Sequence, residues 1–208
     1  MLTEEFRTLA GPGTAQTRVL GSRFSARAFA LTEVASFESI LDDIKKINYD
    51  SSHHCWASIE RGDTELIERQ SDAGEPKGTA GLPILQEIKK QNLENCAVVV
   101  TRWFGGTKLG TGGLVRAYSE CAALSLADAN IIARKTGLIV IVHADYDLQS
   151  FVYQLAAKNS AVVDVEAGRD GTRLSVKLRA NQVSEFIDTL RELSAGKLIG
   201  KIGSSWTS

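Results

Sequence analysis

The chain has 208 residues, of which 43% are hydrophobic and 24% charged, and its formal net charge is −1. This composition is typical of a soluble globular protein that buries one large core or two small ones. The near-zero charge argues against a protein that coats nucleic acid by a general basic excess, so an anion site would have to be local. Cys55, Cys96 and Cys121 are far apart and lack CxxC spacing, which indicates neither a disulfide framework nor a structural zinc site.

The N-terminal segment MLTEEFRTLAGPG carries acidic residues where a signal peptide would carry a basic region and then an apolar one. No apolar run approaches the ~18 residues of a membrane-spanning helix. We therefore expect a cytoplasmic protein that does not have a membrane as its partner. The oligomeric state is left open by the sequence.

The first part of the chain alternates predicted strands and helices. Strands are expected at 14–22, 23–32, 53–60 and 96–104, and helices at 33–48, 82–92 and 114–130. Thr32 is expected to cap the first of these helices, and residues 61–65 to form a polar, flexible segment. The run CAVVVTRWF at 96–104 is the most apolar strand, which indicates a central position in the sheet.

The second part of the chain has a more regular pattern. Strands are expected at 136–146, 161–168, 173–180 and 197–204, with helices at 147–159 and 182–193. Asp170-Gly171 is a hairpin signal between the middle strands. The resulting βαββαβ order predicts a ferredoxin-like sandwich. The fold class is therefore α+β with two domains, 1–134 and 135–208.

A glycine-rich loop, TRWFGGTKLGTGG at 101–113, joins a predicted strand to a predicted helix. It is not a Walker loop, because Gly105 to Gly110 is followed by Thr111-Gly112, and it is not a dinucleotide fingerprint, because Val115 stands where the last glycine would be. A glycine-rich turn before a helix presents free N–H donors and the positive end of the helix dipole, which favours anion binding. No acidic residue occurs between Glu94 and Glu120.

A second glycine-rich turn, SDAGEPKGTAG at 71–81, opens another predicted helix, with Thr79 as a candidate N-cap. If both helices begin at one edge of the sheet, the two turns form a shared anion cradle. The alternative is that the glycines only make tight connections between strand and helix. The predicted cradle consists of Lys77, Gly78, Thr79, Arg102, Gly105, Gly106, Lys108, Gly110, Thr111, Gly112, Gly113 and Arg116.

A further candidate site comprises His53, His54, Asp72 and Glu75. Neighbouring strand residues point to opposite faces, so two adjacent histidines rarely bind one metal ion, and at most one of them faces the cradle. Asp72 and Glu75 could act as an acid/base pair, although a carboxylate in such a turn more often caps the next helix. We predict no metal, no cofactor and no recognisable nucleophile with its base.

Three motifs together carry a family resemblance. They are His53-His54-Cys55-Trp56-Ala57, the turn at 71–81, and the segment from Thr101 to Tyr118. In their order and spacing the chain resembles the IMPACT family, and its bacterial YigZ-like members in particular, over most of residues 15–130. The N-terminal Ser22-Arg23-Phe24 also fits. Ala73 stands where the family often has a second aspartate, and Trp103 replaces the usual tyrosine.

The resemblance implies a fold and a biological setting. For the first domain it implies the α+β fold of the second domain of ribosomal protein S-five, shared with domain IV of elongation factor G. For the second domain it implies a likeness to domain V of that factor. Eukaryotic members are associated with translational control under amino-acid starvation.

Two functions from different classes follow from these expectations. The first is a binding protein that uses the cradle to hold phosphates of RNA, on the ribosome or a translation-factor complex. The second is a hydrolase-like enzyme that binds a small phosphorylated or carboxylated substrate in the same cradle, with Asp72, Glu75 or a histidine transferring a proton. A purely protein-binding role, with Trp56, Trp103 and Phe104 as anchors, is a third. The sequence favours the first, because it shows no nucleophile or metal set.

Overall fold

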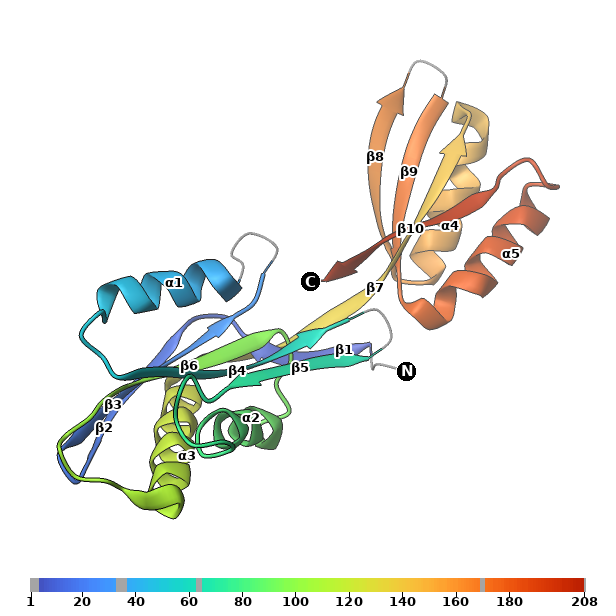
Figure 1. The fold of residues 1–208 in the computed structure, drawn as a ribbon. Helices are drawn as coiled ribbons and strands as arrows, with labels where there is room; N and C mark the ends of the chain where they lie inside the picture. The colour runs from blue at the N-terminus through green and yellow to red at the C-terminus, as the bar shows by residue number, and fades with distance from the viewer. Residues whose placement is uncertain (1–3, 33–36, 63–64, 169–170, 208) are drawn as a thin grey trace. The chain divides into compact units, whose positions relative to one another are not determined.

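The described residues form two β-sheets, and the chain divides into two compact units (Figure 1). The computed structural model describes residues 4–32, 37–62, 65–168 and 171–207. The units comprise Met1–Ala133 and Arg134–Ser208. The sequence-based boundary at 134/135 lies one residue further along the chain. Within the described ranges, no helix combines the length and the apolar character needed to cross a bilayer.

The sheet of the first unit is antiparallel, and β6 lies at its centre. Its strands are β2 (Gly13–Val19), β3 (Ser22–Ala30), β6 (Cys96–Trp103), β4 (His53–Arg61) and β5 (Leu66–Ser71), in that spatial order. Every residue of β6 except Trp103 is buried, as the continuous apolar run predicts.

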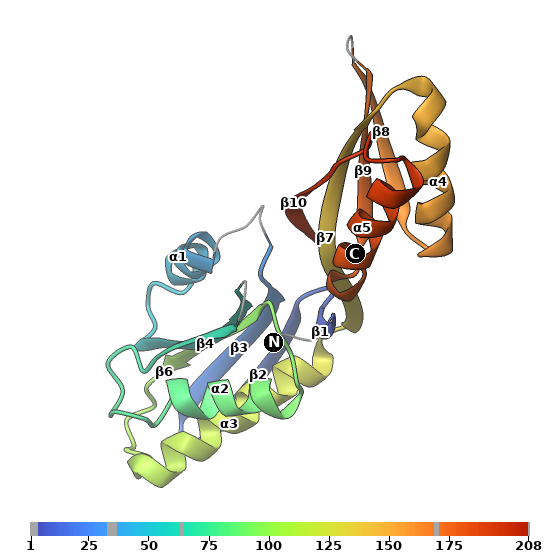
Figure 2. The ribbon, with the colours of Figure 1, turned by 90° about the vertical axis from the view of Figure 1, so that its right-hand side faces the viewer.

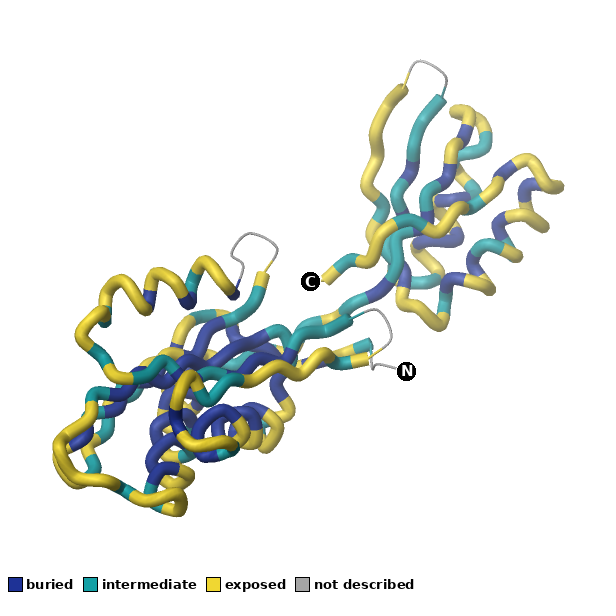
Figure 3. The backbone as a smooth tube through the Cα atoms, viewed as in Figure 1, coloured by how far each residue is buried: buried dark blue, intermediate teal, exposed yellow. Residues whose placement is uncertain are grey.

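Helices cover both faces of this sheet. The helices α2 (Gly81–Lys90) and α3 (Gly110–Asp128) lie side by side on one face, and α1 (Phe37–Ile47) lies on the other (Figures 1 and 2). The main core fills the space between the sheet and the helices α2 and α3, where Figure 3 shows buried stretches of the chain. Phe24, Ile84, Val98 and Tyr118 are fully buried there. A smaller cluster holds α1 against the opposite face.

Some elements differ from the predictions. Residues 66–71 form β5, although the sequence predicts only a polar segment near them, because they pair with β4 at the sheet edge and leave most side chains exposed. A short strand, β1 (Glu5–Leu9), was not predicted either. The expected cap of α1, Thr32, precedes residues 33–36, which lie outside the described residues.

The second unit has the predicted βαββαβ order. Its elements are β7 (Ile131–Ala144), α4 (Gln149–Lys158), β8 (Val162–Gly168), β9 (Gly171–Leu178), α5 (Val183–Leu193) and β10 (Gly200–Thr207). Short 3-10 turns precede the helices, at Tyr146–Leu148 and Ala180–Gln182. The strands pair antiparallel in the spatial order β10, β7, β9, β8, and α4 and α5 pack over one face around Val140, Val176 and Phe186.

Candidate functional site

The loop between β6 and α3 carries the glycine cluster, and the structure shows which of these glycines the backbone geometry requires. Gly105 lies against the backbone of Gly21, where an added Cβ would come within 1.9 Å of the Gly21 carbonyl carbon. Gly110 has φ of +68°, which side chains other than glycine rarely adopt. These two glycines are therefore required by the fold itself.

Gly112 and Gly113, by contrast, lie inside the first turn of α3. The helix begins at Gly110, four residues before the predicted start at 114. The prediction began the helix later because it assigned these glycines to the loop. A Cβ on Gly112 would meet nothing closer than an Nη atom of Arg116, at 3.7 Å. Helix geometry therefore gives no reason for glycine at 112, and its backbone is open to approach from outside.

The N-terminus of α3 is open. In the part of the chain that the structure describes, no side chain caps it, and no acidic residue lies in its first turn. Among the described residues, no hydrogen bond engages the backbone N–H groups of Gly110, Thr111 and Gly112. These donors and the helix dipole together favour an anion. Lys108 is exposed just before the helix, and Arg116 is exposed one turn into it.

A pocket of about 250 Å³ adjoins this helix start. Gly110, Thr111 and Lys108 contribute to its polar side. Its apolar walls come from Pro76, Phe104, Leu109 and Leu114. The polar side chains of Glu75 and Arg102 complete the lining. The pocket thus brings the turn before α2 and the start of α3 together at one end of the unit.

Arg102 does not extend into solvent as the predicted cradle requires. Its side chain is only 6% exposed, and its Nη1 lies 2.5 Å from Oε1 of Glu75, whose side chain is 4% exposed. The expectation of an exposed phosphate ligand is therefore corrected, because burial makes Glu75 the partner of this guanidinium. The two residues are 27 positions apart, and no sequence motif indicates the pairing.

Further hydrogen bonds fix this buried ion pair. The hydroxyl of Tyr118 donates to Oε1 of Glu75 at 2.8 Å, and Nη2 of Arg102 donates to the Ser22 hydroxyl at 3.2 Å. The Gly105 N–H also donates to Ser22. The network therefore ties α3, the turn before α2, β6 and the start of β3 to one another.

One donor of this network has no partner. Nε of Arg102 is buried and makes no hydrogen bond within the described part of the chain. The guanidinium lies between two aromatic rings, 5.5 Å from the centroid of Phe24 and 5.6 Å from that of Phe104. An unpaired buried donor costs stability, and such groups occur at binding sites. Arg102 is also one of the residues that line the pocket.

Asp72 occupies the other half of the predicted cradle. Its carboxylate accepts hydrogen bonds from the backbone N–H groups of Gly78, Ala80 and Gly81, at 2.7, 3.0 and 2.9 Å. Partial burial would raise the pKa of Asp72, but these three donors outweigh it and hold the pKa below its usual value. Asp72 therefore acts as the cap of α2.

This turn corrects two of the cradle assignments, Gly78 and Thr79. The Gly78 N–H is already bound to Asp72, so it is not available to a ligand. Thr79 is not the N-cap of α2, because it is buried and its hydroxyl donates to the carbonyl of Pro76 at 2.7 Å. Lys77 is exposed but does not line the pocket. The part of the predicted cradle that remains open is the start of α3 with Lys108 and Arg116.

The two histidines are separated by the strand that carries them. His53 contacts the turn before α2: its Nδ1 lies 2.9 Å from the Ala73 carbonyl, and its Nε2 lies 3.9 Å from Oε1 of Glu75. His54 instead contacts Thr101 and Ser51. Burial, the charge of Lys45 and the neighbouring His53 lower the pKa of His54. The described residues contain no cluster of three or more metal-ligating side chains.

The three cysteine thiols are buried. Burial raises the pKa of Cys55 to about 12, although the hydrogen bond with Tyr118 acts in the opposite direction. Cys55 donates to the Asp72 carbonyl at 3.0 Å and contacts the Tyr118 hydroxyl at 3.3 Å. Since Asp72 is a helix cap and Glu75 is held by Arg102 and Tyr118, neither carboxylate is placed as the predicted acid/base pair requires.

Known proteins are similar to this chain over much more of its length than this site. Residues 20–126 match the model of the Impact N-terminal domain. The IMPACT family member YvyE of Bacillus subtilis is 30% identical over 176 residues, which span 85% of this chain and 81% of the relative. The IMPACT family member YigZ of Escherichia coli is 30% identical over 197 residues, spanning 91% and 93%.

A solved structure is also similar along nearly the whole chain. It is described as the crystal structure of an hypothetical protein, and it matches with a TM-score of 0.70 and 27% sequence identity. The match covers 98% of this chain and 99% of that one. The likeness therefore includes both units.

Proposed function

Because this chain belongs to the IMPACT family, we propose that it is a translation-associated binding protein whose first unit holds phosphates of RNA, on the ribosome or a translation-factor complex. The contact surface is the open N-terminus of α3 together with Lys108 and Arg116, which we call the α3 phosphate site. Arg102 lies at the adjoining pocket rather than on the exposed surface.

The observation that carries this proposal is the uncapped helix start. Natural helices usually satisfy their first N–H groups by a side chain, as Asp72 does for α2. At α3 the same groups face outward beside two exposed cations, and glycine at 112 leaves the backbone accessible. Phosphate is the anion that RNA presents on its surface, and helix starts bind it well.

The modest number of cations sets the expected strength of binding. Two cations support only a few phosphate contacts, so the affinity for RNA alone should be low and strongly dependent on salt. This agrees with the net charge of −1, which leaves no general attraction for nucleic acid. Binding to a ribosome would require further contacts.

We also propose that the two units correspond to the second domain of ribosomal protein S-five and to domains IV and V of elongation factor G. The antiparallel sheet with α2 and α3 on one face supports the first correspondence. The βαββαβ order of the second unit supports the other. Such a pair of domains would suit a protein that approaches the ribosome as a translation factor does.

Co-sedimentation with ribosomes at low and moderate salt tests the α3 phosphate site. The double variant Lys108→Gln/Arg116→Gln removes two cations, and the matched control Lys45→Gln/Lys46→Gln removes two exposed cations of α1 on the other face of the sheet. We expect wild type and control to pellet at low salt and the test variant to remain in the supernatant. Equal pelleting of all three proteins, or of none, would contradict the proposal. Arg102 is not replaced, because its loss would destabilise the fold.

A further inference from the structure

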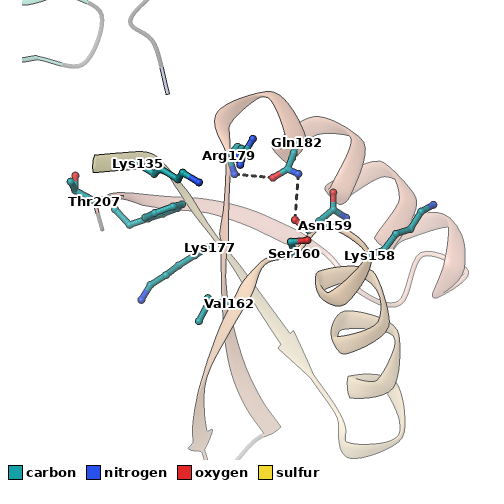
Figure 4. A pocket seen from close by; sticks show the side chains of 10 residues that line it. Lys135, Lys158, Asn159, Ser160, Val162, Lys177, Arg179, Gln182 and Thr207 are labelled. Carbon is teal, nitrogen blue, oxygen red and sulfur yellow. Dashed lines mark hydrogen bonds between the residues drawn. The ribbon is translucent and has the colours of Figure 1, made fainter. Parts of the chain in front are cut away.

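The second unit has a larger pocket, of about 650 Å³, which lies entirely within residues 134–208 (Figure 4). Its lining comes from β7, the end of α4, β8, β9, the turn before α5, and β10. None of the sequence motifs falls in this region. The residues are brought together only by the fold.

The lining is strongly biased in charge. It includes Lys135, Lys158, Lys177 and Arg179, and no acidic side chain. Residues 134–208 as a whole carry ten Lys and Arg and eight Asp and Glu, so the bias belongs to this pocket and not to the unit. Of these cations, Lys177 pairs with Asp164 of β8 at 3.0 Å. Figure 4 shows the Lys158 side chain directed away from Arg179 and Lys135.

An aromatic ring borders the same pocket. Trp206 lies in β10 opposite Gly137 of β7, where the missing Cβ leaves room for the indole. Its Nε1–H donates to the Leu178 carbonyl at 3.2 Å, which fixes the ring in position. The side chain is partly exposed, so it combines a fixed ring with access from solvent. A base can stack on such a ring while its phosphates contact nearby cations.

Hydrogen bonds also fix the wall opposite β10. The side chain of Gln182 accepts from the Arg179 N–H at 3.1 Å and donates to the Asn159 carbonyl at 3.4 Å, and Figure 4 shows both bonds. The end of α4 is thereby joined to the turn before α5. A pocket with fixed walls loses less conformational entropy when a ligand binds.

We propose that this pocket binds a nucleotide unit, with its phosphate held by Lys135 and Arg179 and its base stacked on Trp206. Figure 4 shows the Lys135 side chain extending toward Arg179. The unit belongs either to single-stranded RNA or to a free mononucleotide, since both present the same phosphate and base. This site goes beyond the proposed function, which concerns the start of α3. It stands on a different unit and on different side chains.

Two measurements test the proposal with the full chain. Fluorescence anisotropy measures the affinity for a labelled short oligouridylate, with unlabelled 5′-UMP as a competitor. Proton–nitrogen NMR follows the three indole resonances during the same titrations, with Trp206 assigned by Trp206→Phe. Strong competition by 5′-UMP identifies a mononucleotide site, and weak competition identifies an RNA site.

Matched variants separate this pocket from general attraction. Lys135→Gln/Arg179→Gln should weaken oligonucleotide binding by about tenfold or more at low salt, whereas Lys197→Gln/Lys201→Gln, of equal charge and outside the pocket, should change it less than about twofold. Trp206→Leu should weaken binding by roughly fivefold or more. In the wild-type protein, the Trp206 indole resonance should shift when the nucleotide ligand is added.

Three results would overturn the inference. The first is an equal loss of affinity in the pocket double variant and in the control Lys197→Gln/Lys201→Gln. The second is an unmoved Trp206 resonance at saturating ligand, and the third is an absence of binding by either ligand. The variant Lys108→Gln/Arg116→Gln separates the two proposals: if ribosomes are still bound by that variant while the Trp206 resonance shifts with nucleotide, the α3 phosphate site fails and this pocket stands.

Discussion

The guanidinium of Arg102 and the carboxylate of Glu75 form a buried ion pair, 2.5 Å apart, beside the pocket at the start of α3. Tyr118 and Ser22 complete the hydrogen bonds around it. Removing two charges from water is costly, and a buried pair recovers this cost only through good geometry. The pair therefore makes each partner strongly dependent on the other.

Replacing Arg102 alone should be severely destabilising. Arg102→Met leaves Glu75 buried without a counter-charge, which should lower the free energy of unfolding by about 3–5 kcal/mol. The double variant Arg102→Met/Glu75→Gln removes both charges and keeps an acceptor for Tyr118, so it should recover most of this loss. Urea unfolding followed by fluorescence measures both. A single variant that loses less than about 1 kcal/mol would show that the pair is not needed.

Asp72 should stabilise the first unit in a pH-dependent way. Asp72→Asn weakens the acceptor of three backbone N–H groups and should cost on the order of 1–2 kcal/mol near neutral pH. Because the folded-state pKa is lowered, this stabilisation is fully present above the unfolded pKa, about 3.9, and is lost as the pH falls through the folded value.

Urea unfolding between pH 3 and pH 7 therefore should show a difference between wild type and Asp72→Asn that shrinks in acid. Asp42→Asn, at an exposed carboxylate on α1, serves as the control and should change stability little. A difference that is constant over this range would mean that Asp72 does not act as a charged cap.

Two glycines of α3 should respond to alanine in opposite ways. Gly110→Ala places a side chain at φ of +68° and should cost roughly 1 kcal/mol of stability. Gly112→Ala meets no close atom and should leave stability unchanged or raise it by up to about 1 kcal/mol. Gly112→Ala should nevertheless weaken ribosome co-sedimentation, because the new Cβ covers the open helix start. Full binding by a folded Gly112→Ala protein would remove Gly112 from the site.

The three cysteines should be unreactive in the folded protein. Cys55, Cys96 and Cys121 are buried, and burial raises the pKa of Cys55 and of Cys96 to about 12. A disulfide exchange reagent at pH 8 should therefore modify no thiol of the native protein within minutes and all three thiols in concentrated urea. Rapid reaction of Cys55 in the native state would show that the neighbourhood of Tyr118 opens.

The fold could be predicted from sequence where its signal is periodic. The buried run of β6 and the amphipathic helices α1, α2 and α5 lie close to the predicted ranges. The strand β5 was missed because edge pairing needs no apolar pattern, and its residues are mostly polar. The start of α3 was misplaced because glycine is a poor helix former, while the helix here is held by its packing in the core.

The site was less predictable, since charge count does not tell whether a cation is exposed. Arg102 lies in β6 and has no acidic residue near it in the sequence, yet the fold brings Glu75 to it. The role of Ser22 had one signal, its place in the Ser-Arg-Phe motif. No sequence feature indicated the pocket around Trp206, because several separate segments of the chain contribute its lining.

The position of β6 in its sheet affects how the protein must be made. Strands β3 and β4 do not pair with each other, and each is joined to the sheet through β6. During synthesis, residues 13–71 can form only two separate hairpins until residues 96–103 have left the ribosome, and isolated hairpins are marginally stable. The unpaired edges of β3 and β4 are exposed during that interval, so the nascent chain is most vulnerable to aggregation just before its central strand emerges.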